Sequence, residues 1–177
     1  HTHVYIVAYR NPFLSANALA TLDAISDGRL ILGVAAGYLR PEFESLGVDY
    51  ERRNALLDQG IDIMKAAWTG ATITVDTPEF QCPGGTAILP LPAQRPHPPI
   101  WIGGNSKAAI RRVVARGNGW SPFANPSVKT RTKTAVLNST DELARRIGML
   151  RTLADEAGST DPIDICFAPL AQGFGGK

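Results

Sequence analysis

Apolar residues follow two different spacings along this chain, one typical of strands and one typical of helices. Residues 4–9 and 29–35 form β-branched or nearly continuous apolar runs, and the second reads as a strand buried on both faces of a parallel sheet. Between these runs, Ala18, Leu22 and Ile25 recur at steps of four and three, which predicts a helix with this face in the core. The chain is therefore predicted to begin as strand, helix, strand.

A second, longer helix is predicted after the second strand. Residues 53–68 place four large apolar side chains on one face: Leu57, Ile61, Met64 and Trp68. Serine residues mark other helix starts. Ser15 is the predicted N-cap of the first helix, and Ser139 with Glu142 has the spacing of a capping box. The helix after this box is predicted to bury Leu143, Ile147, Leu150 and Ala154.

Three further short apolar runs, at 100–102, 120–123 and 163–168, predict strands. A helix between the first two of these is predicted to bury Ile110 and the valines at 113 and 114. The remaining long segment, residues 73–99, is rich in Pro and Gly and is predicted to be an excursion containing a hairpin.

The order of elements is strand, helix, strand, helix, excursion, strand, helix, strand, helix, strand, within a single domain of residues 1–177. Such alternation indicates an α/β fold with a parallel sheet, either open and doubly wound or closed as a (β/α)8 barrel. No Gly-x-Gly-x-x-Gly pattern follows the first strand, which weakens the dinucleotide-binding alternative. The spacing alone leaves both architectures open.

Composition narrows the possible partners. A net charge of +2 gives no reason to expect nucleic acid, and no apolar run is long enough to span a membrane. The two cysteines and three histidines lack metal-ligand spacing, so we expect no metal and a cytoplasmic location. The chain begins without methionine beside an extended run and ends directly after another, so we expect a piece of a longer protein.

The most informative candidate site is the segment Gly103-Gly104-Asn105-Ser106. In parallel α/β folds the chemistry lies at the carboxyl ends of strands, and this segment joins such an end to a helix. Two glycines allow close approach of a ligand to the backbone, and the helix N-terminus favours an anion. The segment is either a phosphate site or a tight turn with Asn105 or Ser106 as a helix cap.

Other strand ends carry weaker signals. Gly33 and Gly37 bracket the end of the second strand and would admit either a flat ring or a closely packed helix. Glu42 is either an acid or base or a surface carboxylate, and His3 is either a proton donor or structural. Trp120 belongs either to the core or to the lining of a pocket.

A series of short sequence segments, occurring in a fixed order between Thr2 and about Phe167, carries a resemblance to a known family. They are His3-Val4 through Arg10-Asn11-Pro12, Ala20-Thr21-Leu22-Asp23, Ser26-Asp27-Gly28-Arg29-Leu30, Leu32-Gly33-Val34, Gly37-Tyr38, Glu42-Phe43, Leu46-Gly47, Arg53, Asp58-Gln59, Pro98-Pro99-Ile100-Trp101-Ile102-Gly103-Gly104 and Gly117-Asn118-Gly119-Trp120. Together they resemble the luciferase-like family of flavin- or deazaflavin-dependent oxidoreductases. The family usually has Glu at Gln59 and Asp at Asn118.

The resemblance implies a (β/α)8 TIM-barrel with an insertion that matches residues 73–99. About five of the eight barrel strands are present, so the barrel is expected to be incomplete. It also implies an F420-dependent oxidoreductase that moves a hydride through the deazaflavin cofactor, coenzyme F420. The alternative cofactor is flavin mononucleotide (FMN), used by a monooxygenase with molecular oxygen.

The resemblance further implies where the cofactor binds. Backbone amides of Gly103 and Gly104 would hold its phosphate, with polar help from Asn105 or Ser106. The strand end Ala36-Gly37-Tyr38 would border the ring and side chain. A cis peptide between His3 and Val4 would form a bulge behind the ring. Relatives of the deazaflavin branch have polar residues where this chain has Ala35-Ala36, so hydrogen bonding there is not implied.

No catalytic acid or base can be named from these residues. The expected partner is a small organic substrate, with neither nucleic acid nor membrane, and a homodimer is the oligomeric state considered for the full-length protein. A non-catalytic phosphate- or sugar-binding module is the alternative from another class. Expressed alone, the chain is expected to be inactive, to bind cofactor weakly and to be unstable as a monomer, because an open sheet exposes unpaired edges.

Overall fold

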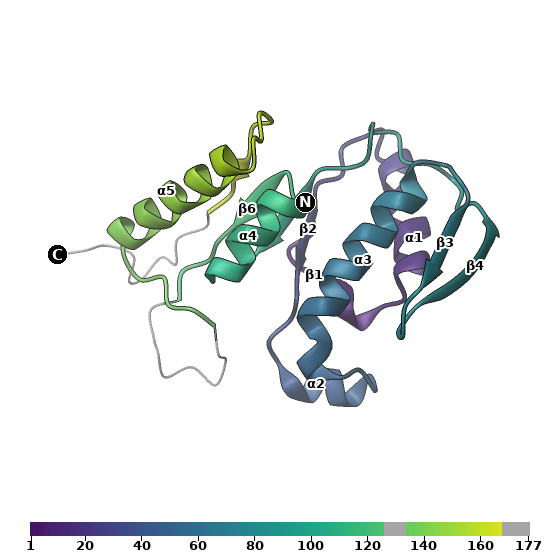
Figure 1. Cartoon of the computed structure of the whole chain (residues 1–177), viewed down its shortest axis with the longest axis horizontal. Helices are drawn as coiled ribbons and strands as arrows, with labels where there is room; N and C mark the ends of the chain where they lie inside the picture. The colour runs from purple at the N-terminus through teal and green to yellow at the C-terminus, as the bar shows by residue number, and fades with distance from the viewer. Residues whose placement is uncertain (126–133, 168–177) are drawn as a thin grey trace. The chain divides into compact units, whose positions relative to one another are not determined.

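A computed structural model describes residues 1–125 and 134–167 of the chain. The chain divides into two compact units, His1–Pro99 and Ile100–Lys177. Each unit contains parallel strands connected through helices (Figure 1). The strand–helix alternation predicted from the sequence is therefore confirmed.

The first unit is built on a strand–helix–strand connection. Strand β1 (Tyr5–Ile6) pairs in parallel with β2 (Leu32–Ala35), and helix α1 (Pro12–Ile25) lies between them in sequence. Helix α3 (Arg53–Trp68) runs beside α1 (Figure 1). The indole N–H of Trp68 donates to the carbonyl of Ala16 at 2.9 Å, which joins the two helices inside the core.

Helix α3 has the bounds and the buried face that its spacing predicts. Leu57, Ile61 and Met64 are fully buried and Trp68 is 1% exposed. Gly60 allows the close approach of α3 to the segment after β1, because a Cβ there would lie 2.4 Å from Cγ1 of Val7. The predicted helix is confirmed in both extent and orientation.

Helix α1 begins earlier than predicted and buries a different face. Asn11 is its N-cap and accepts from the N–H of Phe13 at 2.9 Å, so Ser15 lies inside the helix and is buried. Leu22 and Ile25 are 45% and 79% exposed, and Ala18 is exposed as well. The buried positions are instead Pro12, Ser15, Ala16, Leu19, Ala20 and Asp23.

A buried carboxylate helps to explain why α1 has this orientation. Asp23 is completely buried because its carboxylate accepts hydrogen bonds from the backbone N–H of Gln94 at 2.9 Å and from its side-chain amide at 2.7 Å. A buried carboxylate needs such partners. Fixing Asp23 inward turns Leu22 and Ile25 outward.

The sequence predicts an extended run over residues 4–9, but only part of this run is a strand. Only Tyr5–Ile6 form a strand, and the next residues form a 3-10 turn, η1 (Val7–Tyr9). Val7 and Ala8, both buried, lie in this turn rather than in a strand. The region between β2 and α3 contains α2 (Arg40–Ser45) and η2 (Tyr50–Arg52), two short helical elements that the spacing of apolar residues did not predict.

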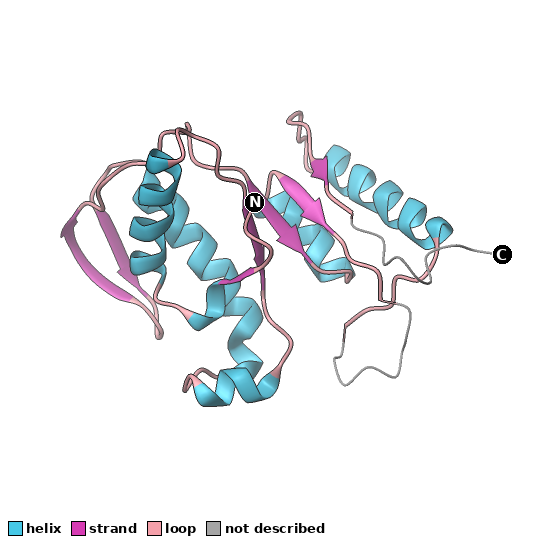
Figure 2. Ribbon diagram, turned by 180° about the vertical axis from the view of Figure 1, so that it is seen from behind, coloured by secondary structure: helices cyan, strands magenta, loops and turns pink. Residues whose placement is uncertain are grey.

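The predicted excursion contains the expected hairpin. Strands β3 (Ile73–Asp76) and β4 (Gln81–Thr86) pair antiparallel, with Val75 opposite Cys82. The hairpin is visible from both sides of the molecule (Figures 1 and 2). The chain then returns through Gln94 to the contact with Asp23.

The second unit continues the parallel pattern. Strand β5 (Ile100–Gly103) pairs with β6 (Gly119–Ser121), which pairs with β7 (Asp164–Ile165). Helix α4 (Lys107–Arg116) connects the first pair and α5 (Thr140–Glu156) precedes β7. Helices α4 and α5 lie side by side (Figure 2).

Two details of this unit differ from expectation. The strands predicted at 120–123 and 163–168 are shorter, and residue 168 lies outside the described residues. Ser139 caps α5 as predicted, accepting from the N–H of Glu142 at 3.2 Å. Only Leu150 of α5 is fully buried, and its three other predicted core residues are half-buried, as is the residue at 114 in α4.

Candidate functional site

The turn after β5 has the form of a strand-to-helix turn with a helix cap. Gly104 has φ +123°, a conformation that favours glycine, and a Cβ there would lie 3.1 Å from Cβ of Ala109. Ser106 is the N-cap of α4, and its Oγ accepts from the N–H of Ala109 at 3.1 Å. The N–H groups of Lys107 and Ala108 belong to the first helical turn and have no partner within the helix.

The side chain of Asn105 is used inside the unit. It is 2% exposed; its amide donates to the carbonyls of Phe123 at 2.8 Å and Ala135 at 3.1 Å. Its carbonyl oxygen accepts from the N–H of Phe123 at 3.1 Å. Asn105 therefore positions the segments around residues 123 and 135, and its remaining group for a ligand is the backbone N–H.

Trp120 orients the same turn from β6. Its side chain is completely buried, which places it in the core, and its indole N–H donates to the carbonyl of Gly104 at 2.8 Å. Because a trans peptide directs its carbonyl and its N–H to opposite sides, the N–H of Asn105 points away from Trp120. The sequence analysis did not assign this positioning role, although an indole placed in a core needs an acceptor.

In the first unit, the glycines near β2 are explained by close packing. A Cβ on Gly33 would lie 2.2 Å from the carbonyl oxygen of Thr2, whose hydroxyl bonds both the N–H and the carbonyl of Gly33. Gly37 has φ +82°, and a Cβ there would lie 2.9 Å from the ring of Phe43. These contacts come from the first residues and from α2.

The other predicted ring contacts lie on neighbouring strands. The peptide between His3 and Val4 is cis, which confirms that expectation. Tyr5 lies opposite Val34, so Val4 is level with Gly33. Ala36, Gly37 and Tyr38 follow at the carboxyl end, roughly 10 Å further along at about 3.3 Å per residue.

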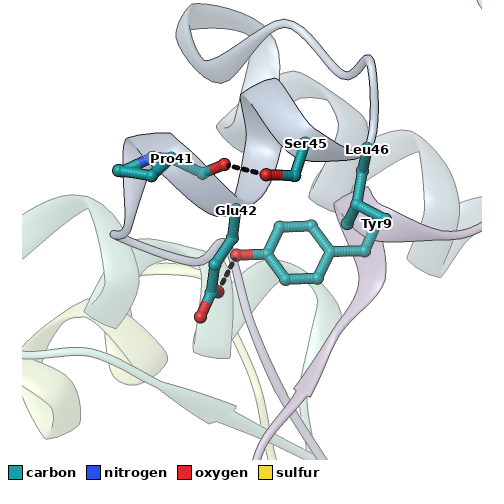
Figure 3. Close-up of a pocket in the computed structure, with 5 residues that line it drawn as sticks. All are labelled: Tyr9, Pro41, Glu42, Ser45 and Leu46. Atoms are coloured by element: carbon teal, nitrogen blue, oxygen red, sulfur yellow. Dashed lines mark hydrogen bonds between the residues drawn. The ribbon is translucent and has the colours of Figure 1, made fainter.

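A surface pocket of about 470 Å³ lies beside this end of the sheet, between η1 and α2 (Figure 3). It is lined by Tyr9, Pro41, Glu42, Ser45 and Leu46. The hydroxyl of Tyr9 donates to Oε2 of Glu42 at 2.5 Å, and the hydroxyl of Ser45 donates to the carbonyl of Pro41 at 2.8 Å. The carboxylate is thus oriented by a phenol rather than by a cation.

Burial raises the pKa of Tyr9 well above its ordinary value, and the hydrogen bond and negative charge of Glu42 raise it further. Tyr9 is therefore a neutral donor at physiological pH, and Glu42 is the acceptor. The ring of Tyr9 packs edge-on against Phe43, with centroids 4.7 Å apart. Glu42 was predicted to be either an acid or base or a surface carboxylate, and the structure shows it exposed and lining a pocket. The sequence analysis did not identify Tyr9 as its partner.

The predicted site residues thus fall into two groups, one in each unit. His3, Val4 and the segment Ala36-Gly37-Tyr38 belong to the first, and the segment Gly103-Gly104-Asn105-Ser106 belongs to the second. Within residues 1–125 and 134–167, no group of three or more His, Cys, Asp or Glu could hold a metal ion. No helix in the described ranges is long and apolar enough to cross a membrane.

The luciferase-like monooxygenase family matches this chain over residues 2–160, and the chain belongs to that family. An uncharacterized protein of Mycobacterium tuberculosis is 31% identical over 156 residues, which are 88% of this chain and 48% of the relative. The FMNH(2)-dependent dimethylsulfone monooxygenase of Pseudomonas putida is 32% identical over 113 residues, 62% of this chain and 31% of that protein. The chain spans about half the length of the first of these relatives.

Solved structures show the same fold. Monooxygenase RslO1 from Streptomyces bottropensis matches with a TM-score of 0.75 and 24% identity, over 93% of this chain and 47% of its own. The coenzyme F420 dependent tetrahydromethanopterin reductase of Methanopyrus kandleri matches with a TM-score of 0.68 and 18% identity, over 89% and 46%. The chain is accordingly an α/β protein with a mostly parallel sheet that forms part of a luciferase-like TIM barrel.

Proposed function

We propose that the protein is an oxidoreductase that uses coenzyme F420 to exchange a hydride with a small organic substrate, and that Gly103-Gly104-Asn105-Ser106 binds the phosphate of this cofactor. The observation that carries the proposal is the turn after β5. Gly104 has no side chain and a positive φ, and the turn leads directly into the N-terminus of a ten-residue helix. Backbone N–H groups and the helix dipole at such a point favour a phosphate.

The residues of the turn fit an anionic group. Trp120 holds the carbonyl of Gly104 away from such a group, since a carbonyl oxygen would repel phosphate. The capping bond of Ser106 uses one lone pair of Oγ, which leaves its O–H free to donate. The first helical turn carries no acidic residue that would oppose binding.

The residues at the ends of β1 and β2 offer an apolar surface for the cofactor ring. Val4, directly before β1, is 41% exposed, and Tyr38 and Leu39, between β2 and α2, are 50% and 39% exposed. Ala36 and Gly37 bring no polar side chain to this place, so polar contacts there would come from the backbone. When bound, coenzyme F420 supplies hydride transfer at C5 of its ring, and the protein's part is to position it and to exclude solvent.

Fluorescence-quench titrations of the whole protein with coenzyme F420 and with FMN test the proposal. We expect tighter binding of coenzyme F420 and no oxygen consumption during turnover. Tighter binding of FMN together with oxygen uptake would contradict it. Binding without oxidation or reduction of either cofactor would support a phosphate-binding module instead.

An FMN-dependent monooxygenase is the second candidate. The observation in its favour is the relative from Pseudomonas putida, which is an FMNH(2)-dependent monooxygenase with 32% identity over its matching region. The same phosphate turn would serve this cofactor. Oxygen uptake therefore distinguishes the two candidates, whereas substitutions in the turn do not.

A further inference from the structure

In the pocket between η1 and α2, one carboxylate oxygen of Glu42 accepts a hydrogen bond and the other can accept one from a ligand. Oε2 of Glu42 accepts the hydroxyl of Tyr9 at 2.5 Å. Among the described residues, Oε1 has no hydrogen-bond partner. Figure 3 shows the carboxylate extending from α2 to the hydroxyl of Tyr9.

The basic side chains of the surrounding segments are engaged elsewhere. The guanidinium of Arg10 lies 4.5 Å from the centre of the Tyr5 ring and donates to the carbonyl of Ile6 at 3.3 Å. Arg40 forms an ion pair with Glu51, and its guanidinium lies 4.4 Å from the centre of the Tyr50 ring. Neither arginine forms an ion pair with Glu42 in the described part of the chain, although the charge of Arg10 is close enough to oppose slightly the rise in the pKa of Tyr9 that burial and Glu42 cause.

Apolar surface surrounds this charge. Leu46 is 54% exposed and lines the pocket together with Pro41 and Tyr9. The carboxylate has a fixed orientation and lies beside exposed aliphatic and aromatic side chains. These features suit a ligand in which a positively charged hydrogen-bond donor is attached to a short hydrocarbon chain. A charge-assisted hydrogen bond would use the available oxygen, and the hydrocarbon would cover Leu46 and Pro41.

We propose that this pocket is a binding subsite for a small aliphatic ammonium group, recognised by Glu42 with the carboxylate held in place by Tyr9. The proposal does not depend on the identity of the cofactor, because all its residues belong to η1 and α2. It implies that a substrate or effector of the protein carries a primary amine. The raised pKa of Tyr9 is consistent with it, because a neutral phenol stays a hydrogen-bond donor to the carboxylate.

Amide NMR titration of the whole protein with n-butylammonium chloride tests the subsite. We expect saturable shifts of the amides of Glu42 to Leu46, and at least fivefold weaker binding in Glu42→Gln, which keeps the shape of the side chain and an acceptor for Tyr9. Glu44→Gln removes the same charge from the same helix outside the pocket and is expected to leave the affinity unchanged. Tyr9→Phe, which frees the carboxylate, is expected to weaken binding two- to threefold.

Three results would overturn the subsite. One is the absence of saturable shifts in α2. Another is equal weakening by Glu44→Gln and Glu42→Gln, which would mean attraction to the general charge of the helix. The third is equal binding of n-butanol or butyrate, which would show that the positive charge is not recognised.

Discussion

The turn after β2 and the turn after β5 both pass through a glycine with positive φ, but they are held in different ways. Gly37, with φ +82°, is followed by a six-residue helix whose N-cap, Leu39, provides no side-chain hydrogen bond. Gly104, with φ +123°, is followed by a ten-residue helix capped by Ser106. The first turn is held by packing against Phe43, and the second by hydrogen bonds: Trp120 donates to Gly104, and the side chains of Asn105 and Ser106 accept from backbone N–H groups.

The difference suits the two proposed roles. A turn held by polar bonds keeps its N–H groups in fixed directions, which an anion requires. A turn held by an aromatic contact leaves apolar side chains such as Tyr38 and Leu39 exposed, which suits a flat ring. If the comparison is right, substitutions in the first turn should act mainly on stability, and those in the second also on binding.

The largest effect is expected for Gly37→Ala. Positive φ costs an alanine roughly 1 kcal/mol, and overlap with the Phe43 ring adds about 2 kcal/mol, for a loss of about 3 kcal/mol in unfolding free energy. Urea denaturation would measure it. Gly47→Ala is the matched control, because Gly47 has φ +68° and nothing within 4 Å of its missing Cβ. Equal losses in the two variants would show that packing does not hold this turn.

Gly104→Asp is expected to weaken cofactor binding at least tenfold, about 1.4 kcal/mol. The added carboxylate would stand where the proposed phosphate binds. Gly104→Ala shares the backbone strain and the contact with Ala109 but not the charge, so the difference between the two variants isolates the electrostatic part. Cofactor titration monitored by fluorescence gives both values, and equal affinities would refute the phosphate site.

Ser106→Ala is expected to lower stability by about 1 kcal/mol through loss of the helix cap. It should also weaken cofactor binding several-fold, because the serine hydroxyl is a proposed donor. Ser139→Ala removes the equivalent cap from α5 and should cost similar stability without any change in binding. Thermal melts and cofactor titrations of both variants test this, and parallel behaviour of the two serines in binding would count against the site.

The smallest effect is expected from giving α2 the kind of cap that α4 already has. Leu39→Asp should stabilise the protein by about 0.5 kcal/mol, because a carboxylate at the N-cap can accept from the N–H of Glu42, since Pro41 has no N–H, and it complements the helix dipole. Leu46→Asp places the same group at the C-cap of this helix, where the dipole opposes it, and should give no gain. A stabilisation by both variants would mean that the effect is one of surface charge alone.

The two long helices of the first unit show what the sequence can and cannot predict. Helix α3 has apolar residues on one face and polar residues on the other, so its spacing identified both its ends and its buried side. Helix α1 has apolar or small residues almost all round, so several faces fit the helical spacing. Its orientation is determined by the contact between Asp23 and Gln94, residues 71 positions apart, which no local pattern reveals.

The candidate site shows the same limit. The turn from Gly103 to Ser106 could be located from its glycines and from the following helix, and the cap at Ser106 was one of the two interpretations considered. The use of the Asn105 side chain could not be predicted, because its partners Phe123 and Ala135 lie 18 and 30 positions away. The bond from Trp120 to Gly104 and the bond from Tyr9 to Glu42 were not predicted for the same reason, because their partners lie 16 and 33 positions away.

The contact between Asp23 and Gln94 also makes the excursion of residues 73–99 a modular part of the fold. It ties the returning end of the excursion to the core independently of the hairpin β3–β4. Doubling the length of a flexible loop costs only about 0.6 kcal/mol in closure entropy. The hairpin tip can therefore be lengthened, shortened or exchanged for a peptide tag while the packing of α1 and α3 is preserved, which makes it the natural position for grafting foreign sequence into this chain.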